Sequence, residues 1–315
     1  MNLFKEASLL FAISLALASC GGNVGTSRLA SESRASEKDA RAFYNAGIAA
    51  QKAGKLGRAR KYYQRIVLRH PLCPTAADSA YRWGKLLEKD GQPLEAFEAY
   101  DAILTKYPNS PNYAEAMSRQ NIIAHQVANG HIQNSFVGIK SRVDLKRSAE
   151  MLSKVRQNAP RTEAAEKAQY TIGQLYQTRG KGFLGITRAI KAFEELTRDY
   201  PDSKYAAEAQ YRIGEILLDE SNDGNQDSAN LERAKRAFED VIIRYPNTQQ
   251  AKKAKAQVAK LTSGDIQKSF DIAEFYEKKG QISSALFYYR EAVSRSKPGP
   301  LRTRAQARIK QLTAQ

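Results

Sequence analysis

Apolar residues from Ala40 to the end of the chain recur at helical spacing. They fall three and four positions apart, which places them on one face of an amphipathic helix. No run shows the strict alternation of apolar and polar residues that a half-buried strand would have. The pattern therefore predicts an all-α protein.

A spacing of small, aromatic and proline residues repeats along this region. Each copy begins with a small residue, followed by alanine 12 positions later, an aromatic residue 16 later and proline 24 later. Two copies keep this spacing without insertions: Gly47, Ala59, Tyr63 and Pro71, then Gly84, Ala96, Tyr100 and Pro108. Later copies end at Pro201, Pro246 and Pro298 with insertions or shifts, and residues 113–160 form a degenerate copy. The chain thus predicts six helix pairs.

The residue types indicate how each copy would fold. Small residues on both helices of a pair let the two backbones approach closely, and the aromatic residue fills the neighbouring hole. A glycine can end the first helix in the left-handed conformation, and the proline cannot continue the second. The candidate helix-ending glycines are Gly54, Gly91, Gly180 and Gly280. These features resemble the tetratricopeptide repeat, which implies a superhelix (α-solenoid) of about six helix pairs, with the basic segment LRTRAQARIKQL as a C-terminal capping helix.

The first twenty residues predict export and lipidation. The apolar segment at residues 9–18 is shorter than the roughly 20 residues that a membrane-spanning helix needs, so residues 1–19 are expected to be a signal peptide. Leu17, Ala18, Ser19 and Cys20 resemble the bacterial lipoprotein box, which implies that Cys20 carries acyl chains such as palmitate. Gly21 stands where an aspartate would retain the protein in the inner membrane, which implies sorting to the outer membrane. An ordinary signal peptide that contains a cysteine is the alternative.

The segment after the signal peptide predicts a flexible tether over residues 20–39. It is rich in Ser, Gly, Ala and charged residues, with almost no apolar side chain to bury. If Cys20 is lipidated, Cys73 has no partner for a disulfide within the chain. Cys73 is therefore expected to be a packing residue.

The charge balance predicts an anionic partner. The chain has 50 Lys and Arg residues against 33 Asp and Glu residues, for a net charge of +17. Such a charge suits nucleic acid, lipid headgroups or an acidic protein. The basic segments KKAKAQVAK and RTRAQARIK could contact nucleic acid, but export to the periplasm argues against it. A positive surface near anionic lipid or an acidic partner domain is the preferred interpretation, and no nucleic-acid partner is expected.

No pattern in the sequence predicts an enzyme, a cofactor site or a metal site. Residues 180–185 match GxGxxG by letter, but a dinucleotide site needs a preceding strand, and a helix is expected there instead. The three histidines are too far apart to share one helix face. No nucleophile stands beside a matching base.

Several longer segments resemble the BamD (YfiO) family of outer-membrane assembly lipoproteins, in the same order along the chain. They are FYNAGIAAQKAGKLGRARKYYQRIVLRHP, YPNSPNYAEAM, SFVGIKSRVD and SFDIAEFYEKKGQISSAL. The resemblance implies a non-enzymatic scaffold of the outer-membrane β-barrel assembly (BAM) complex, anchored by lipid at the periplasmic face of the outer membrane. It also implies that N-terminal repeats (residues 40–160) bind unfolded barrel precursors. The C-terminal repeats and capping helix (residues 161–315) would dock the BamA-type barrel subunit and other assembly subunits.

The chain departs from the family in two places, and one other function class remains open. It has at least one helix pair more than the family core of about five repeats, within residues 160–246, and His70 stands where the family usually has tyrosine. The alternative is an envelope repeat lipoprotein that serves peptidoglycan, polysaccharide or Tol-Pal machinery. Proteins coordinating Tol-Pal usually carry an N-terminal coiled coil, and residues 21–40 lack the apolar heptads for one. An enzyme with attached repeats ranks third, because no stretch remains to house a catalytic domain.

Candidate binding residues lie mainly on the first helices of the pairs. The concave wall of a superhelix would present Arg41, Tyr44, Tyr81 and Lys85. Aromatic rings beside cations suit an extended peptide that ends in an aromatic residue and a carboxylate. The alternative is that the two tyrosines pack against the neighbouring repeat. The candidates for docking the barrel subunit are Phe270, Glu274, Glu277 and Arg290.

Overall fold

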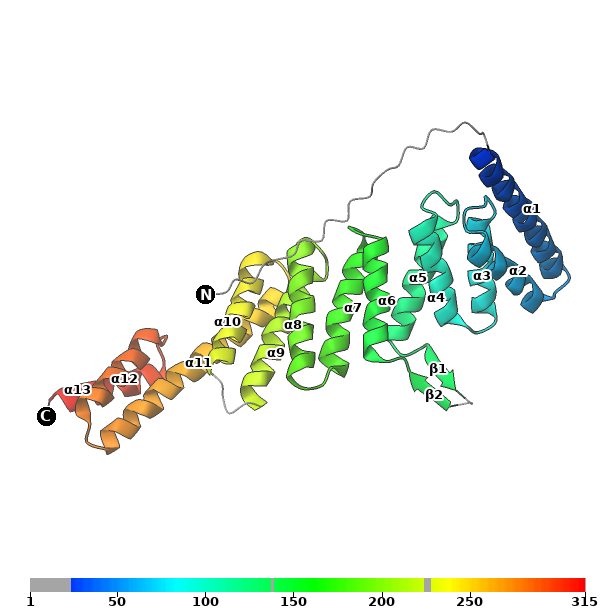
Figure 1. Cartoon of the computed structure of the whole chain (residues 1–315). Helices are drawn as coiled ribbons and strands as arrows, with labels where there is room; N and C mark the ends of the chain where they lie inside the picture. The colour runs from blue at the N-terminus through cyan, green and yellow to red at the C-terminus, as the bar shows by residue number, and fades with distance from the viewer. Residues whose placement is uncertain (1–23, 137–138, 224–227, 315) are drawn as a thin grey trace, which may run out of the picture. The chain divides into compact units, whose positions relative to one another are not determined.

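A computed structural model describes residues 24–136, 139–223 and 228–314. Within these residues the chain folds into thirteen α-helices and one β-hairpin (Figure 1). The pairs are α1 (Val24–Lys52) with α2 (Leu56–Arg69), α3 (Ala76–Lys89) with α4 (Pro93–Lys106), α5 (Tyr113–Ala128) with α6 (Leu145–Asn158), α7 (Glu163–Arg179) with α8 (Gly182–Asp199), α9 (Ala206–Asp223) with α10 (Ser228–Arg244), and α11 (Gln249–Lys278) with α12 (Ile282–Arg295), followed by α13 (Pro300–Thr313). The predicted helical repeat architecture of six pairs and a C-terminal helix is confirmed. The predicted signal peptide and the predicted lipidation site Cys20 lie outside the described residues.

The described residues divide into two compact units, 24–87 and 88–314. The first unit contains α1, α2 and most of α3. Its core joins Ala50 of α1, Ala59 and Tyr63 of α2, and Leu86 of α3. The second unit contains the remaining helices. The functional division at residue 160 stays a prediction.

The small and aromatic residues of a copy meet where the two helices of a pair pack together. In α9 and α10, a Cβ atom added to Gly214 would lie 2.6 Å from Cε1 of Phe238, whose side chain is fully buried. In α1 and α2, a Cβ atom on Gly47 would lie 2.7 Å from Cε1 of Tyr63. The aromatic ring thus fills the space beside the glycine, and no larger residue fits there. The spacing found in the sequence reflects this contact.

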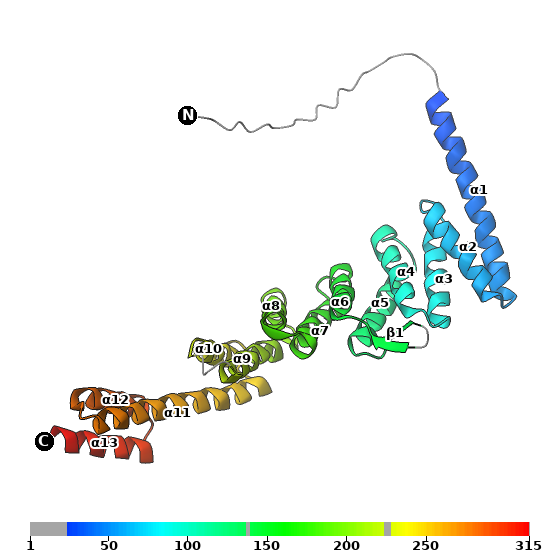
Figure 2. The same ribbon diagram turned by 60° about the horizontal axis from the view of Figure 1, so that its bottom comes forward.

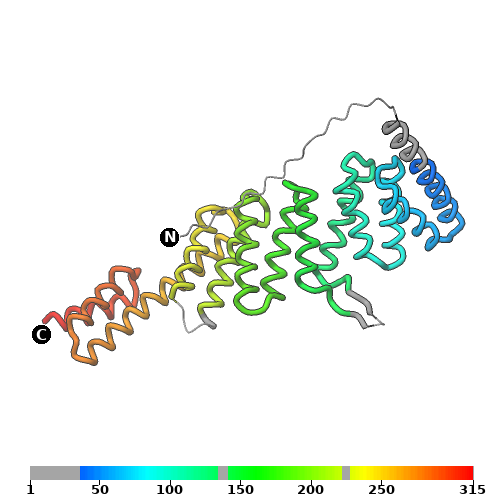
Figure 3. The backbone as a smooth tube through the Cα atoms, viewed as in Figure 1, coloured from blue at the N-terminus to red at the C-terminus, as the bar shows by residue number. Residues whose placement is uncertain are grey.

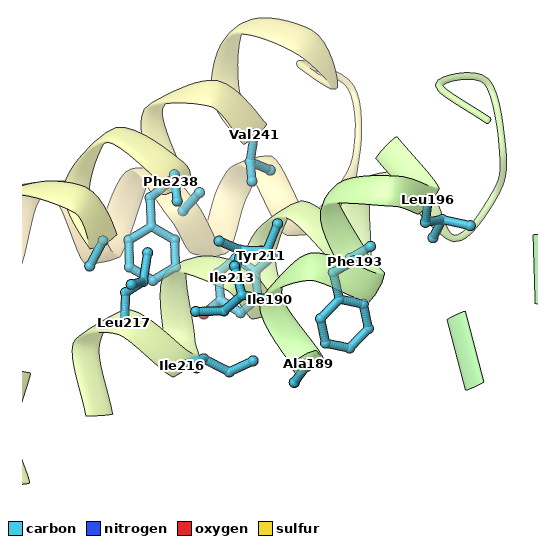
Figure 4. Close-up of a cluster of buried hydrophobic side chains, with 14 of the residues drawn as sticks. Ala189, Ile190, Phe193, Leu196, Tyr211, Ile213, Ile216, Leu217, Phe238 and Val241 are labelled. Carbon is cyan, nitrogen blue, oxygen red and sulfur yellow. The ribbon is translucent and has the colours of Figure 1, made fainter. Parts of the chain in front are cut away.

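One continuous apolar core joins helices α8 to α11 in the second unit. Figure 4 shows Phe193 of α8, Tyr211 of α9 and Phe238 of α10 within it. The ring centres of Tyr211 and Phe238 are 5.2 Å apart. Because each helix of this region is covered by neighbours from adjacent pairs, stacking rather than any single pair buries the core.

The segment between α5 and α6 forms a β-hairpin that the sequence did not predict. Strands β1 (Gln133–Phe136) and β2 (Ile139–Arg142) pair antiparallel, with Gln133 opposite Arg142. The hairpin lies between α5 and α6 in the chain order, which can be followed along the backbone in Figure 3. Each strand has only four residues, which is too short for a period of two to stand out. The fold remains helical, with this hairpin as an insertion.

Helix α1 begins at Val24, whereas the sequence predicted a flexible tether up to residue 39. The segment contains no proline that would stop a helix. The hydroxyl of Ser36 lies 2.8 Å from Nδ1 of His70, and Ala40 is fully buried. These contacts hold the later part of the expected tether in the first unit. Cys73 lies close by and is half-buried, in agreement with a packing role.

The turns between paired helices follow the glycine prediction in three of four positions. Gly54, Gly91 and Gly280 have φ values of 71°, 71° and 72°, which glycine adopts without strain. Gly180 differs, because its φ is −67° and the positive φ occurs at Gly182 instead. A Cβ on Gly180 would lie 2.7 Å from Cα of Gly185, so glycine here permits close passage of two backbone segments.

Helix α11 is longer than the other helices that begin a pair in the second unit. It has 30 residues, whereas α5, α7 and α9 have 16, 17 and 18. Thr248 caps its first turn, because its hydroxyl accepts a hydrogen bond from the amide of Ala251 at 3.2 Å. Figure 2 shows α12 and α13 lying along its second half. In the part of the chain that the structure describes, no helix has the length and apolarity to span a bilayer.

Candidate functional site

The first candidate surface lies on α1 and α3 in the N-terminal unit. Tyr44 of α1 donates a hydrogen bond to Asp78 of α3, and Arg82 donates to the same carboxylate at 2.6 Å. The guanidinium carbon of Arg82 is 5.8 Å from the centre of the Tyr44 ring. Burial and the hydrogen bond with Asp78 together raise the pKa of the Tyr44 hydroxyl above its ordinary value. Tyr44 therefore joins α1 to α3, as the packing alternative predicted.

The other three N-terminal candidates are more open. Nζ of Lys85 lies 5.4 Å from the ring centre of Tyr81, one helical turn earlier on α3. The Lys85 side chain is exposed and Tyr81 is half-buried. Arg41 is exposed and forms an ion pair at 3.3 Å with Glu37 on its own helix. The structure thus brings Tyr81 and Lys85 together as an aromatic ring beside a cation.

Asp78 and Arg82 are the residues of this surface that the sequence did not predict. They fix the hydroxyl and the ring face of Tyr44. Their spacing of four residues on one helix is typical of an ion pair and was visible in the sequence. Their contact with Tyr44 was not, because the two helices meet across 34 residues of sequence.

The second candidate surface lies on α11, α12 and α13. Phe270 belongs to the core there, because its side chain is only 1% exposed. Its ring centre is 5.3 Å from that of Tyr289, and Arg304 of α13 lies 4.8 Å from it. The expectation that Phe270 contacts a partner is therefore wrong for this structure. Residue 270 faces the interior of the pair, which the apolar spacing alone did not distinguish from the outer face.

The two predicted glutamates attach α13 to α11. Glu277 accepts a hydrogen bond from Tyr289 at 2.7 Å and forms an ion pair with Arg308. Glu274 forms an ion pair with Arg304 at 3.3 Å. Arg290 is exposed on α12. The structure does not bring Arg290 into this ion-pair cluster.

The same tyrosine, carboxylate and arginine arrangement occurs in an earlier copy. Tyr100 of α4 donates to Glu88 at 2.6 Å, and Arg119 of α5 forms an ion pair with Glu88. In each case the carboxylate lies on the first helix of a pair and links the second helix of that pair to the helix that follows it. Glu277 therefore has a structural role whether or not a partner binds nearby.

The sequence did not predict an exposed aromatic patch on α11 and α12. We define it as Phe275, Tyr276, Phe287 and Tyr288. Phe275 is 54% exposed and Phe287 is 63% exposed, and the rings of Tyr276 and Tyr288 stack with centres 5.6 Å apart. Exposed aromatic groups of this kind mark interaction surfaces.

The position of Phe275 within its repeat could have indicated this patch from the sequence. Phe275 lies two residues after the small residue Ala273 that begins the last copy. Three earlier copies bury an aliphatic residue at that position: Leu86, Leu175 and Ile216. The first copy has the small residue Ala49 there, which is exposed. A large aromatic residue therefore stands exposed in the last pair where those three copies bury an aliphatic one.

The described part of the chain assembles no candidate metal site. No group of three or more His, Cys, Asp or Glu side chains is placed to hold a metal ion there. His125 is buried, with Nδ1 3.4 Å from the Thr171 hydroxyl. The described surfaces are suited to binding other molecules through aromatic and charged side chains.

A comparison with family models matches residues 36–219 to YfiO, an outer membrane lipoprotein family. The chain belongs to the YfiO family. A tetratricopeptide-repeat model matches residues 208–248. The YfiO match covers nearly all of the first four helix pairs, and the SFDIAEFYEKKGQISSAL segment lies beyond it. The protein is an outer-membrane assembly lipoprotein of the YfiO family, built of tetratricopeptide repeats.

Solved structures with similar folds are distant from this YfiO-family chain. MamA from Desulfovibrio magneticus RS-1 is 15% identical, over 67% of this chain and 97% of that chain, with a TM-score of 0.30. A tetratricopeptide repeat protein from Parabacteroides merdae ATCC 43184 is 13% identical, over 88% of this chain and 100% of that chain, with a TM-score of 0.30. YrrB is 17% identical, over 74% and 98%, with a TM-score of 0.32. A comparison with curated protein sequences found no match.

Proposed function

We propose that this protein is a non-enzymatic scaffold of the BAM complex. It binds unfolded barrel precursors through its N-terminal repeats and docks the BamA-type barrel subunit through its C-terminal repeats. The YfiO match over residues 36–219 is the observation that carries the proposal. The protein would act from the periplasmic face of the outer membrane, held there by lipid on Cys20.

The precursor-binding surface is proposed to centre on Tyr81 and Lys85. An aromatic ring and an exposed ammonium group 5.4 Å from its centre suit a peptide end that offers an aromatic side chain and a carboxylate. Tyr44, fixed by Asp78 and Arg82, would form a rigid wall beside this pair rather than a mobile contact. Arg41 would add positive charge at the exposed surface of α1.

The docking surface for the barrel subunit is proposed to include Arg290 and the exposed aromatic patch. Glu274 and Glu277 support it indirectly, because they hold α13 against α11. Arginine and aromatic residues dominate the energetics of protein interfaces. Phe270 contributes to the packing beneath this surface.

Affinity purification of the full chain from detergent-solubilised envelopes tests the docking proposal. We expect the BamA-type subunit to co-purify, and Arg290→Glu with Phe287→Ala to reduce its recovery at least about tenfold. Arg236→Glu, an exposed charge change on α10, is the matched control and should leave recovery unchanged. Recovery of cell-wall enzymes without any barrel subunit would favour the alternative envelope function and overturn this one.

Fluorescence anisotropy with a labelled peptide that ends in phenylalanine tests the precursor-binding proposal. Lys85→Glu should weaken binding about tenfold, because it places a like charge beside the peptide carboxylate. Lys52→Glu, a charge change at another exposed position at the end of α1, should bind as the parent does. Equal binding by all three proteins would contradict the role given to Lys85.

A further inference from the structure

The last helix pair is displaced from the regular stack by a length of uninterrupted helix. Pro201 precedes the small residue of the next copy, Gly214, by 13 positions, and Pro246 precedes Ala273 by 27. The 14 additional residues lie within α11 and lengthen it by about 21 Å at 1.5 Å per residue. The first half of α11 packs against α9 and α10, and the second half against α12. The interval between these two halves is not covered by the second helix of a pair, as the first helices are elsewhere in the stack.

A groove occupies this interval, and we name it the α10–α11–α13 groove. Its volume is about 590 Å³. Its floor is one face of α11, with Val258, Ala259 and Ile266, and its ends are formed by Ile242 of α10 and Leu301 of α13. Ala259 is exposed and Val258 is only half-buried. In the regular part of the stack the comparable residues are covered, as Ile216 and Leu217 of α9 are buried in the core.

The rim of the groove carries positive charge. Its charged lining residues are Lys255, Arg295, Lys297 and Arg302, and no acidic residue lines it among those the structure describes. Lys255 and Lys297 are exposed. Arg295 is positioned by ion pairs with Asp265 at 3.3 Å and Glu291 at 3.2 Å.

The surrounding segment is basic as a whole. Residues 249–315 contain fourteen Lys and Arg residues and five Asp and Glu residues, a net charge of +9. Four of those acidic groups pair with arginines of this region: Asp265, Glu274, Glu277 and Glu291. Two of them, Asp265 and Glu291, offset the charge of Arg295, so the positive potential over the groove comes mainly from Lys255, Lys297 and Arg302, and it attracts an acidic occupant.

We propose that the α10–α11–α13 groove binds an acidic amphipathic helix of a partner protein. The apolar floor takes the apolar face of the helix, and Lys255, Lys297 and Arg302 of the rim take its carboxylates. In the regular part of the stack the apolar face of a helix is covered by neighbouring helices, as α8 and α10 cover α9. A helix is therefore the element expected to cover the apolar floor of the groove. The inference rests on the groove and its charges and does not require the proposed function. An anionic lipid is the competing occupant, which the experiment distinguishes.

Site-specific photo-crosslinking in intact envelopes tests the proposal with the full chain. A photoreactive amino acid is placed at Ala259 on the groove floor, and at Ala307, an exposed position of α13 outside the groove, as control. Mass spectrometry then sequences the attached peptide. We expect the Ala259 adduct to contain a protein segment with net negative charge and apolar residues at positions i, i+3, i+4 and i+7. The Ala307 site should not yield this segment.

Charge reversal on the rim tests the electrostatic part. Lys255→Glu with Lys297→Glu should lower the yield of the adduct about tenfold or more. The matched control, Lys252→Glu with Lys310→Glu, changes net charge equally at exposed positions that do not line the groove and should leave the yield unchanged. Circular dichroism checks that both variants fold.

Four results would overturn the proposal. They are an adduct to lipid alone, an adduct to a neutral or basic segment, no adduct at Ala259 in protein shown to carry the photoreactive residue, and an equal loss of yield in the two charge-reversal variants.

Discussion

The ring of Phe238 fills the position that a side chain on Gly214 would occupy. A Cβ atom at Gly214 would approach three ring carbons of Phe238 to between 2.6 and 2.8 Å. Phe238 is fully buried, so its ring is enclosed by the surrounding side chains. The glycine and the aromatic residue are therefore two halves of one contact that recurs along the chain.

Gly214→Ala should destabilise the protein by about 1–3 kcal/mol, the usual cost of adding a methyl group to a filled core. Gly264→Ala is the control, because a Cβ there meets nothing within 4 Å and the residue lies inside helix α11. Replacing glycine by alanine in a helix interior stabilises by up to about 1 kcal/mol. Urea unfolding followed by circular dichroism should therefore shift in opposite directions for the two variants. A shift in the same direction would contradict the packing role of Gly214.

Tyr289→Phe should cost about 1–2 kcal/mol, because the Tyr289 hydroxyl donates to the carboxylate of Glu277 at 2.7 Å. Phenylalanine keeps the ring packing and removes only this hydrogen bond. Tyr288→Phe is the matched control, because the structure gives Tyr288 ring contacts to Tyr276 and Phe287. Urea midpoints of the two variants and the parent measure the difference. If Tyr289→Phe matched the parent, the hydroxyl would have no stabilising role.

Protonation of His125 should destabilise the fold at low pH. Burial, with a smaller effect of Lys167, lowers the pKa of His125 from 6.5 to about 4. Between these values the unfolded chain binds a proton that the folded chain does not, so stability is complete above pH 6.5 and falls as the pH decreases toward 4. The loss amounts to about 3 kcal/mol from this group.

The free energy of unfolding at several pH values between 4 and 7.5 measures this effect. His125→Gln should flatten the profile relative to the parent, and His131→Gln, at an exposed position, should not. Parallel profiles for the parent and His125→Gln would show that His125 does not contribute.

Cys20→Ser should move the protein from the membrane fraction to the periplasmic fluid, because serine provides no sulfur for acylation. Cys73→Ser is the control, since Cys73 is the other cysteine of the chain and is half-buried between helices. Fractionation with immunoblotting measures both. Membrane retention of the Cys20→Ser variant would show that another contact anchors the protein.

The repeat contacts could be predicted from the sequence because they join residues at fixed offsets. Gly47 and Tyr63 are 16 residues apart, as the copy spacing requires, and they touch in the structure. The hairpin β1–β2 could not be found this way, because two strands of four residues leave no clear periodic pattern.

The candidate site was predicted less completely than the fold. Helical spacing showed that Phe270 and Phe275 belong to one helix, but the faces covered by α12 and α13 decide which of them is buried. The contact between Tyr44 and Asp78 depends in the same way on how α1 meets α3. Such relationships between separate helices are set by tertiary packing, which local patterns do not encode.

Because α11 is one continuous helix, the number of residues between its two halves sets the orientation of the last helix pair. Each residue inserted between Val258 and Ile266 would turn α12 and α13 by about 100° around the α11 axis and move them by about 1.5 Å. An insertion of seven residues, about two turns, would restore the original facing at a greater distance. The length of this interval therefore determines the direction in which the last pair faces. Natural changes in that length would reorient any partner bound to this pair.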